Sequence, residues 1–210
     1  MPDASITPSL LGDSYRREVC SLLYHAYRHE PTYAYLLDGQ RGGYEQRVRA
    51  TIREVVQRHM SEAQPVLGLL RDDRLLAVAL IVPPQRRLDA HESWMLRLRL
   101  WLRTGLDCTR RYLGYHDAVL GCLPPGPYHY LPLIGVHPEF QGARLGQQLL
   151  DALHAWVNEE SGSQGLVLDT GNTRYLDFYL RQGYHEVGQV ALGGVCEHVL
   201  FHPAAAARGR

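Results

Sequence analysis

The sequence predicts an α/β fold in which helices pack on a mixed β-sheet. With 210 residues, of which 45% are hydrophobic and 21% charged, the chain is long enough to bury a core in one domain. In the first third, apolar residues recur every three or four positions, as they do in amphipathic helices. In the last third, β-rich segments alternate with helical ones, which is the order expected where helices pack on a sheet.

The first half is expected to hold two helices and a hairpin. Helical spacing covers residues 19–27 and 48–56, and a loop rich in aromatic residues begins between them at Glu30. Two apolar runs follow at 65–70 and 75–82, and the polar residues between these runs are typical of a hairpin turn.

Residues 91–103 carry conflicting signals. Leucine and arginine alternate as in a half-buried strand, but the length of the segment and its lack of Val, Ile and Thr favour a helix. Trp94 and Trp101 allow a helix that touches lipid, whereas packing on the sheet with the arginines in water is the favoured interpretation. A further helix is expected at 108–120, before a proline-rich internal loop.

The last third supplies much of the sheet. In chain order, we expect strand 128–136, helix 142–159, strand 166–169, helix 174–182, and strands 185–192 and 196–202. Because the chain shows no internal repeat, residues 1–203 are expected to form a single domain and residues 204–210 a flexible tail. An unpaired edge at the last strand leaves a homodimer as an open alternative.

The charges balance, since 22 basic side chains, all of them arginine, meet 22 acidic ones, and the chain has no lysine. A net charge of zero argues against partners that are bound by bulk charge, so we expect neither a nucleic-acid nor a membrane partner. The longest apolar run is too short to span a bilayer, and the first residues do not resemble a signal peptide. Four widely spaced cysteines form no CxxC pair, which predicts a reduced, cytoplasmic protein without a metal site.

One segment carries most of the chemistry. The strand end Ile134-Gly135-Val136 is followed by a proline, a loop with glycine, and the start of a helix within residues 141–147. The first turn of a helix presents unpaired backbone N–H groups and the positive end of the helix dipole, and glycine lets a ligand approach the backbone closely. Residues 141–147 are therefore a candidate site for a phosphate or pyrophosphate.

Three motifs in this order and spacing resemble a known family. Residues 136–146 read Val-His-Pro-Glu-Phe-Gln-Gly-Ala-Arg-Leu-Gly, residues 168–172 Leu-Asp-Thr-Gly-Asn, and residues 178–184 Phe-Tyr-Leu-Arg-Gln-Gly-Tyr. Together they resemble the GNAT superfamily of acyl-CoA-dependent N-acyltransferases, and within it the branch that includes puromycin N-acetyltransferase. The resemblance implies the GNAT fold, which is a mixed, mostly antiparallel central sheet flanked by helices, with a splayed parallel strand pair at the cofactor cleft. It also implies acetyl-CoA as the cosubstrate.

The resemblance assigns roles to individual positions. The backbone of Ile134, Gly135 and Val136 would run along the pantetheine of CoA. Asn172 would hydrogen bond the cofactor arm, and Tyr179 would protonate the departing thiolate. The CoA pyrophosphate would lie on the loop formed by Gln141, Gly142, Ala143, Arg144, Leu145, Gly146 and Gln147.

Arg144 departs from the family pattern, because it stands where the loop motif has its first glycine. An arginine cannot adopt a glycine backbone angle without strain, although its guanidinium can reach a CoA phosphate.

The acceptor is expected to be a primary amine of a small molecule that attacks the thioester directly, so the site needs a base. Many relatives have an acidic residue in the strand where this sequence has Pro132. The candidates for the base are therefore His129 at the head of the strand, His116 in the preceding helix, and Glu30 in the aromatic loop.

The acceptor is expected to contact Glu30, Tyr33, Tyr35 and His116. The many tyrosines of this half favour a hydrophobic or planar amine over a sugar. Two other functions remain open, namely a non-catalytic acyl-CoA sensor or partner module on the same fold, and a peptide or protein N-acetyltransferase. The missing strand carboxylate favours the former, and an open groove would favour the latter.

Overall fold

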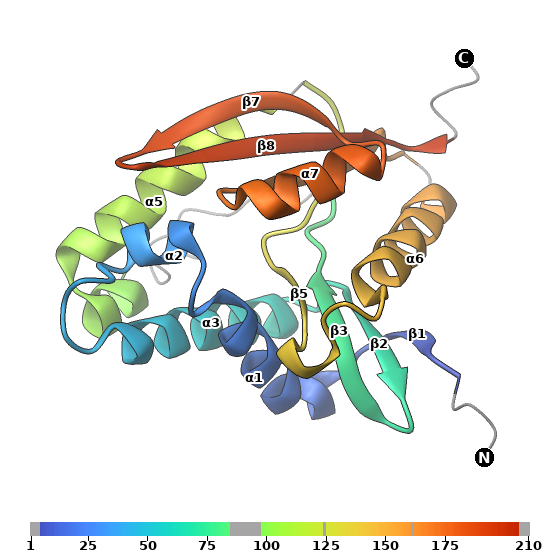
Figure 1. The fold of residues 1–210 in the computed structure, drawn as a ribbon, viewed down its shortest axis with the longest axis horizontal. Coiled ribbons are helices and arrows are strands. Elements are labelled where there is room, and N and C mark those ends of the chain that lie inside the picture. The colour runs from blue at the N-terminus through green and yellow to red at the C-terminus, as the bar shows by residue number, and fades with distance from the viewer. Residues whose placement is uncertain (1–4, 85–97, 124, 161, 206–210) are drawn as a thin grey trace.

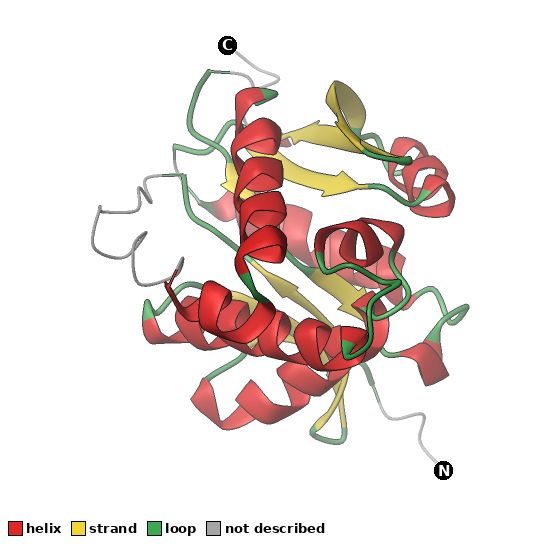
Figure 2. Cartoon of the chain, turned by 90° about the vertical axis from the view of Figure 1, so that its left-hand side faces the viewer, coloured by secondary structure: helices red, strands yellow, loops and turns green. Residues whose placement is uncertain are grey.

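A computed structural model describes residues 5–84, 98–123, 125–160 and 162–205. These residues form two four-stranded sheets, which lie one above the other in Figure 2 with helices around them. This mixed α/β architecture confirms the fold class that the sequence predicted.

The first sheet has the strand order β1-β2-β3-β5 and is antiparallel throughout. Its strands are β1 (Thr7–Leu10), β2 (Val66–Arg71), β3 (Arg74–Leu80) and β5 (Ile134–Val136). The β2–β3 hairpin confirms the prediction, and it turns at Asp72 and Asp73, whose φ angles of 50° and 59° are those of a two-residue hairpin turn. The sequence did not predict β1, a short edge strand that contains Pro8.

The second sheet has the strand order β4-β6-β8-β7. Its strands are β4 (His129–Tyr130), β6 (Gly165–Thr170), β8 (Val195–Pro203) and β7 (His185–Leu192). β4 and β6 are parallel, and the other pairs are antiparallel. The register sets Thr170 opposite His198, which brings the end of β6 beside Glu197 of β8.

The segment expected as a single strand at 128–136 changes its partner midway. β4 pairs with β6, and Leu131 N–H donates to Val167 O (2.9 Å), but Leu133 O accepts from β3 (2.9 Å) and β5 continues along β3. Pro132 lies between the two halves and has no N–H to donate. Beyond this point β5 lies beside β3 (Figure 1), while β6 belongs to the second sheet. The two parallel strands therefore separate, as the resemblance implied.

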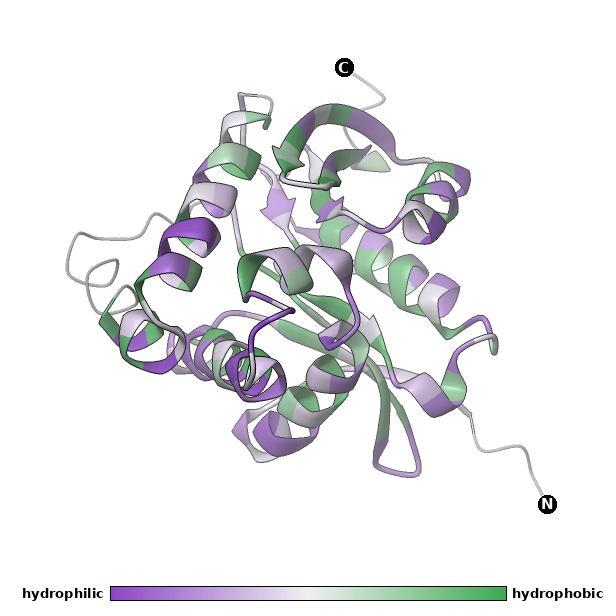
Figure 3. Ribbon diagram, turned by 60° about the vertical axis from the view of Figure 1, so that its left-hand side comes forward, coloured by the Kyte–Doolittle hydropathy of each residue, from purple (hydrophilic) through white to green (hydrophobic). Residues whose placement is uncertain are grey.

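Helices cover both faces of the first sheet. α1 (Arg16–Tyr27) and α3 (Tyr44–Ser61) pack on one face, and α6 (Leu145–Glu159) packs on the other. β2 and β3 are therefore apolar on both sides, as the green ribbon at the centre of Figure 3 shows. α2 (Pro31–Leu36), α5 (Leu106–Gly121) and α7 (Thr173–Arg181) surround the opening between the sheets.

Some helix boundaries differ from the prediction. The expected aromatic loop contains α2, in which Pro31 is the first helical residue, a position that proline favours. α6 begins at Leu145 rather than at Gly142, because residues 142–144 form the preceding turn. Of the helix expected at 91–103, residues 98–103 are helical and residues 91–97 lie outside the described part.

The segment expected as a flexible tail begins in an ordered position. Ala204 is buried, and its N–H donates to Gln164 O (2.9 Å). Ala205 N–H donates to Asn158 Oδ1 (2.8 Å), which ties the end of β8 to α6. Residues 206–210 lie outside the described part.

Candidate active site

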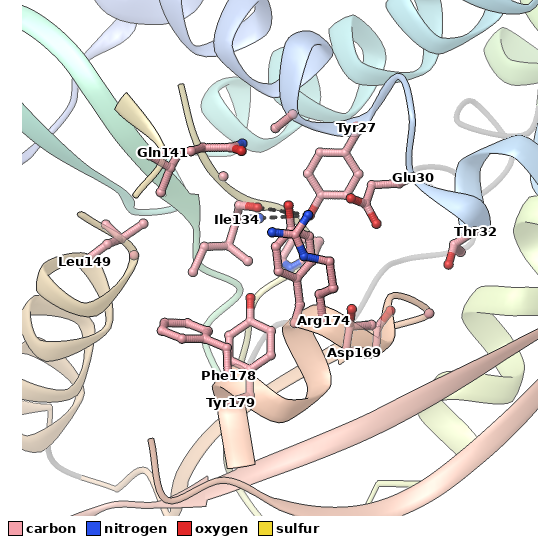
Figure 4. Close-up of a pocket in the computed structure, with 18 of the residues that line it drawn as sticks. Tyr27, Glu30, Thr32, Ile134, Gln141, Leu149, Asp169, Arg174, Phe178 and Tyr179 are labelled. Carbon is pink, nitrogen blue, oxygen red and sulfur yellow. Dashed lines mark hydrogen bonds between the residues drawn. The ribbon is translucent and has the colours of Figure 1, made fainter. Parts of the chain in front are cut away.

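A cavity of about 920 Å³ opens where β5 and β6 separate. Its walls come from α1, α2, α5, β5, the turn before α6, the end of β6, α7 and β8. In Figure 4, Gln141 lies toward one end of this space, Ile134 and Tyr179 lie near the middle, and Thr32 and Asp169 lie toward the other end. One continuous space thus joins residues that are far apart in the sequence.

The first end of the cavity is the turn before α6. Gly142 (φ 85°) and Arg144 (φ 58°, ψ 16°) adopt left-handed conformations there. Gln148 N–H donates to Arg144 O (3.1 Å), so the amides of residues 145–147 precede this bond and have no helical partner. Together with the positive end of the helix dipole, these amides suit a phosphate or pyrophosphate.

Backbone groups of β5 form a side wall of the cavity. Leu133 O and His137 N–H are bonded to β3, so the N–H and C=O groups of Ile134 and Val136 face away from β3 and toward the cavity. The hydroxyl of Tyr27 occupies this position, where it accepts from Ile134 N–H (3.1 Å) and donates to Ile134 O (3.3 Å). A linear amide such as pantetheine can make the same two hydrogen bonds in place of Tyr27.

Glu30 lines the middle of the cavity from the residue that precedes α2. Asn172 Nδ2 donates to its two carboxylate oxygens (3.3 and 3.4 Å), while Asn172 Oδ1 caps α7 by accepting from Arg174 N–H (3.2 Å). Burial raises the pKa of the Glu30 carboxyl, and the hydrogen bond from Asn172 opposes part of this rise. A carboxyl with a raised pKa is suited to accept a proton at near-neutral pH.

Tyr179, on α7, presents its hydroxyl to the same space (Figure 4). The side chain is only 8% exposed, and its hydroxyl makes no hydrogen bond to any described residue. Burial raises the pKa of Tyr179, and the nearby Tyr175, Asp169 and Glu30 raise it further. The phenol is therefore a protonated donor at neutral pH, facing a cavity that also contains Glu30.

The far end of the cavity holds a carboxyl pair that the sequence did not predict. Tyr130 donates to Asp169 Oδ1 (2.6 Å), and Tyr115 donates to Asp169 Oδ2. Thr32 Oγ1 donates to Glu197 Oε2 (2.5 Å). Glu197 is 2% exposed, and burial together with the neighbouring Asp169 holds its pKa well above the usual range. The protonated form of Glu197 is therefore favoured.

Gly171 permits this close approach. A Cβ at this position would lie 2.4 Å from Thr32 Oγ1 and 2.7 Å from Glu197 Oε2, so any larger residue would push the two side chains apart. Asp169 belongs to the Leu-Asp-Thr-Gly-Asn motif at the end of a strand, and that position could have marked it as a site residue. Nothing local in the sequence marks Glu197, because its placement depends on the pairing of β6 with β8.

Residues 110–186 match the family model described as acetyltransferase (GNAT) domain. They include β4, β5, β6, α6 and α7, and so the turn before α6 and Tyr179. The acyl-CoA N-acyltransferase chemistry of such domains agrees with the enzyme class that the motifs implied. No curated protein matches the sequence.

Solved structures share the fold across nearly the whole chain. One is described as histone acetyltransferase HPA2 and related acetyltransferase from Corynebacterium glutamicum, with a TM-score of 0.72 and 19% identity over 96% of this chain and 97% of that chain. Arylalkylamine N-acetyltransferase 2 from Aedes aegypti has a TM-score of 0.70 and 11% identity over 95% and 99%. A polyamine N-acetyltransferase from Drosophila melanogaster has a TM-score of 0.59 and 17% identity over 94% and 98%. At these identities, the likeness shows the GNAT fold.

The structure brings most of the sequence-predicted site residues to one cavity. The ones that line it are Glu30, Tyr33, His116, Ile134, Gly135, Val136, Gln141, Gly142, Arg144, Leu145, Gly146, Gln147 and Tyr179. Ala143 is exposed and does not line the cavity. Tyr35 does not line it either, because its ring packs against Gly193 and its carbonyl accepts from Arg111 (3.0 Å).

Two further predicted site residues lie outside the lining of this cavity. His129 is 2% exposed and lies outside the cavity lining, since its Nδ1 pairs with Ser163 Oγ (2.9 Å) and its ring packs on Trp156. The alternation of β4 puts the neighbouring Tyr130, not His129, in the cavity. Asn172 does not line the cavity, because its amide is engaged by Glu30 and by the start of α7.

Two observations bear on membranes and metals. Within the described residues, no helix is both long and apolar enough to cross a membrane. The same residues contain no group of three or more His, Cys, Asp or Glu side chains that could hold a metal ion.

Arg144 provides a test of the turn before α6. A non-glycine residue in the left-handed region is strained by about 1–2 kcal/mol, which glycine avoids. We predict that Arg144→Gly has a free energy of unfolding about 1 kcal/mol higher than Arg144→Ala, measured by urea denaturation. Both variants lack the guanidinium, so both should show the same rise in KM for acetyl-CoA, about two- to tenfold. Equal stability of the two variants would contradict the strain.

Proposed function

We propose that the protein transfers the acetyl group of acetyl-CoA to a primary amine of a small molecule, within a single domain formed by residues 1–203. The observation that carries this proposal is the single cavity that joins the amide-rich turn before α6 to Glu30 and Tyr179. Structural neighbours include enzymes described as agmatine, polyamine and arylalkylamine N-acetyltransferases, which supports a small amine as the acceptor. The closer resemblance to the puromycin N-acetyltransferase branch rests on the sequence motifs.

Acetyl-CoA fits the first half of the cavity. The backbone amides of residues 141–147 and the Arg144 side chain would hold the pyrophosphate. The pantetheine would hydrogen bond the free backbone groups of Ile134 and Val136, where it would displace the hydroxyl of Tyr27 from Ile134. The thioester would then lie between β5 and β6, next to Tyr179.

The reaction proceeds by direct attack. The bound ammonium loses a proton, its nitrogen forms a bond to the thioester carbon, and the carbon–sulfur bond then breaks. The nitrogen gives up a second proton as the amide forms, and the sulfur gains one to leave as free thiol. One proton is released overall, so the site needs one group that accepts a proton and one that donates a proton.

Glu30 is the proposed base. It lines the cavity, its carboxyl is held in place by Asn172, and burial raises its pKa toward the pH at which amines must be deprotonated. Tyr179 is the proposed acid, because its hydroxyl is protonated and has no other hydrogen-bond partner among the described residues. Both groups face the same space, and charge on Glu30 contributes to the raised pKa of Tyr179.

Release of free CoA with a panel of primary amines tests the function. An acetyltransferase releases thiol in proportion to the acetylated amine, whereas a non-catalytic sensor binds acetyl-CoA without releasing thiol above the rate of hydrolysis. Binding of acetyl-CoA measured by isothermal titration completes the test, because a folded protein that does not bind it would refute both alternatives.

Tyr179→Phe removes only the hydroxyl. We predict that kcat falls by about 10²- to 10⁴-fold, because the thiolate then leaves without a proton donor, while the Kd for acetyl-CoA stays within about twofold. Tyr184→Phe is the matched control, since this buried tyrosine pairs with His154 (3.0 Å) outside the cavity lining. The control should keep its kcat; a similar loss in both variants, or no loss in Tyr179→Phe, would refute the assignment.

Glu30→Gln tests the base through the pH profile. Glu30 must be deprotonated to act, so wild-type kcat/KM should rise with pH through its raised pKa, and Glu30→Gln should lose this acidic limb together with about 10²- to 10⁴-fold of the rate. The raised pKa also means that ionised Glu30 destabilises the fold as pH rises above its unfolded pKa, so Glu30→Gln should not lower the free energy of unfolding at pH 7. Retention of the acidic limb in Glu30→Gln would exclude Glu30 as the base.

A further inference from the structure

The far end of the cavity combines negative charge with aromatic side chains. Asp169 and Glu197 line it, and Tyr33, Tyr112, Tyr115 and Tyr130 line the same region. Throughout the described ranges, neither Asp169 nor Glu197 forms an ion pair with an arginine or a histidine. The arginines that line the cavity come instead from the start of α6 and from α7.

The hydrogen bonds of the pair leave room for a ligand. A carboxylate has about four acceptor positions. Tyr130 and Tyr115 each engage one oxygen of Asp169, and Glu197 lies beside it. Because Asp169 also lines the cavity, its remaining acceptor positions are available to a ligand there. The negative charge of the pair has no cationic partner, which is costly for a buried carboxylate.

A second, independent observation points to a missing ligand. Tyr33 is 6% exposed and lines the cavity, yet its hydroxyl makes no hydrogen bond in the part of the chain that the structure describes. Burial is the main cause of the raised pKa of the Tyr33 hydroxyl, and the neighbouring Tyr112, Tyr27 and Asp169 add to it. A hydroxyl that faces the cavity can accept a hydrogen bond there, and a ligand N–H group would supply the donor.

We propose that this end of the cavity binds a second cationic group of the acceptor, so that the substrate is a diamine or an amine that carries a guanidinium. The inference rests on the proposed acetyl transfer. The amine that reacts would lie between Glu30 and Tyr179, and the rest of the molecule would extend toward Asp169, on the side away from Gln141 in Figure 4.

A cation accounts for this end of the cavity better than an aromatic ring does. The tyrosines alone favour a hydrophobic or planar amine, as the sequence suggested. A neutral ring, however, would remove the remaining water from Asp169 without supplying a positive charge or a hydrogen-bond donor. An ammonium or guanidinium supplies both, and it is also attracted to the faces of surrounding aromatic rings.

The test compares acceptors of the same shape. Diaminobutane and n-pentylamine differ only in the terminal group, and phenethylamine represents the aromatic alternative. We expect kcat/KM for diaminobutane to exceed the other two by about tenfold to a hundredfold, as expected for one charge-assisted contact. In Asp169→Asn/Glu197→Gln, the ratio of kcat/KM for diaminobutane to kcat/KM for n-pentylamine should fall to about one, because the diaminobutane value falls. Circular dichroism and acetyl-CoA titration confirm that this variant is folded.

Matched and milder variants protect the test against misfolding. Asp117→Asn/Glu18→Gln makes the same chemical changes at exposed positions outside the cavity lining and should keep the wild-type ratio. Tyr33→Phe keeps the ring but removes the hydroxyl, and it should lower the ratio of kcat/KM for diaminobutane to that for n-pentylamine by about twofold to tenfold.

The outcomes separate this inference from the proposed function. If all three amines release CoA but diaminobutane has no advantage, or if Asp169→Asn/Glu197→Gln keeps the advantage, the acidic site is refuted and acetyl transfer stands. If no amine is acetylated, the proposed acetyl transfer is refuted. Titration of diaminobutane into the protein–CoA complex then tests whether the acidic end of the cavity binds a cation. Diaminobutane binding that is lost in Asp169→Asn/Glu197→Gln supports the acidic cation site. If diaminobutane does not bind to the wild-type protein, the site is refuted.

Discussion

The change of partner within residues 129–136 is the constraint on which the rest of the structure depends. β4 belongs to the second sheet and β5 to the first. Beyond Val167, β6 therefore has no strand on the side where β4 ends, and the two sheets separate. The backbone groups of Ile134 that would have bonded across this gap still need partners, and Tyr27 supplies them from α1. The cavity is therefore a direct result of the pairing, and the helices around it only shape its walls.

Charge is separated along this cavity although the whole chain is neutral. Backbone amides and Arg144 make one end attractive to anions, while Asp169 and Glu197 make the other end attractive to cations. In the proposed reaction, an anionic cosubstrate and a cationic acceptor would be drawn to opposite ends and would meet between Glu30 and Tyr179. The absence of lysine adds a further consequence, because the protein carries no side-chain amine that could compete with the acceptor.

The sequence predicted the parts of the fold and site that depend on local patterns. The hairpin, the turn before α6 and Tyr179 follow from periodicity or from motifs that read the same in any context. The features it missed depend on contacts between distant segments. His129 looked suitable by residue type, but strand alternation turned it onto Trp156. Glu197 lies in a strand without a recognisable motif, and only the pairing of β8 with β6 brings it to the cavity.

Two carboxyl groups of the same residue type acquire different roles through their surroundings. Burial raises the pKa of Glu30, while the hydrogen bond from the Asn172 amide favours its ionised form and opposes part of this rise. Burial raises the pKa of Glu197, and the neighbouring Asp169 raises it further, so its protonated form is favoured. A group that keeps its proton is a poor base but a good fixed neighbour for a charge. The proposed base would therefore act in the part of the cavity that Tyr179 also lines, while the Asp169–Glu197 pair would hold the far end of the proposed acceptor without competing for the reactive nitrogen's proton.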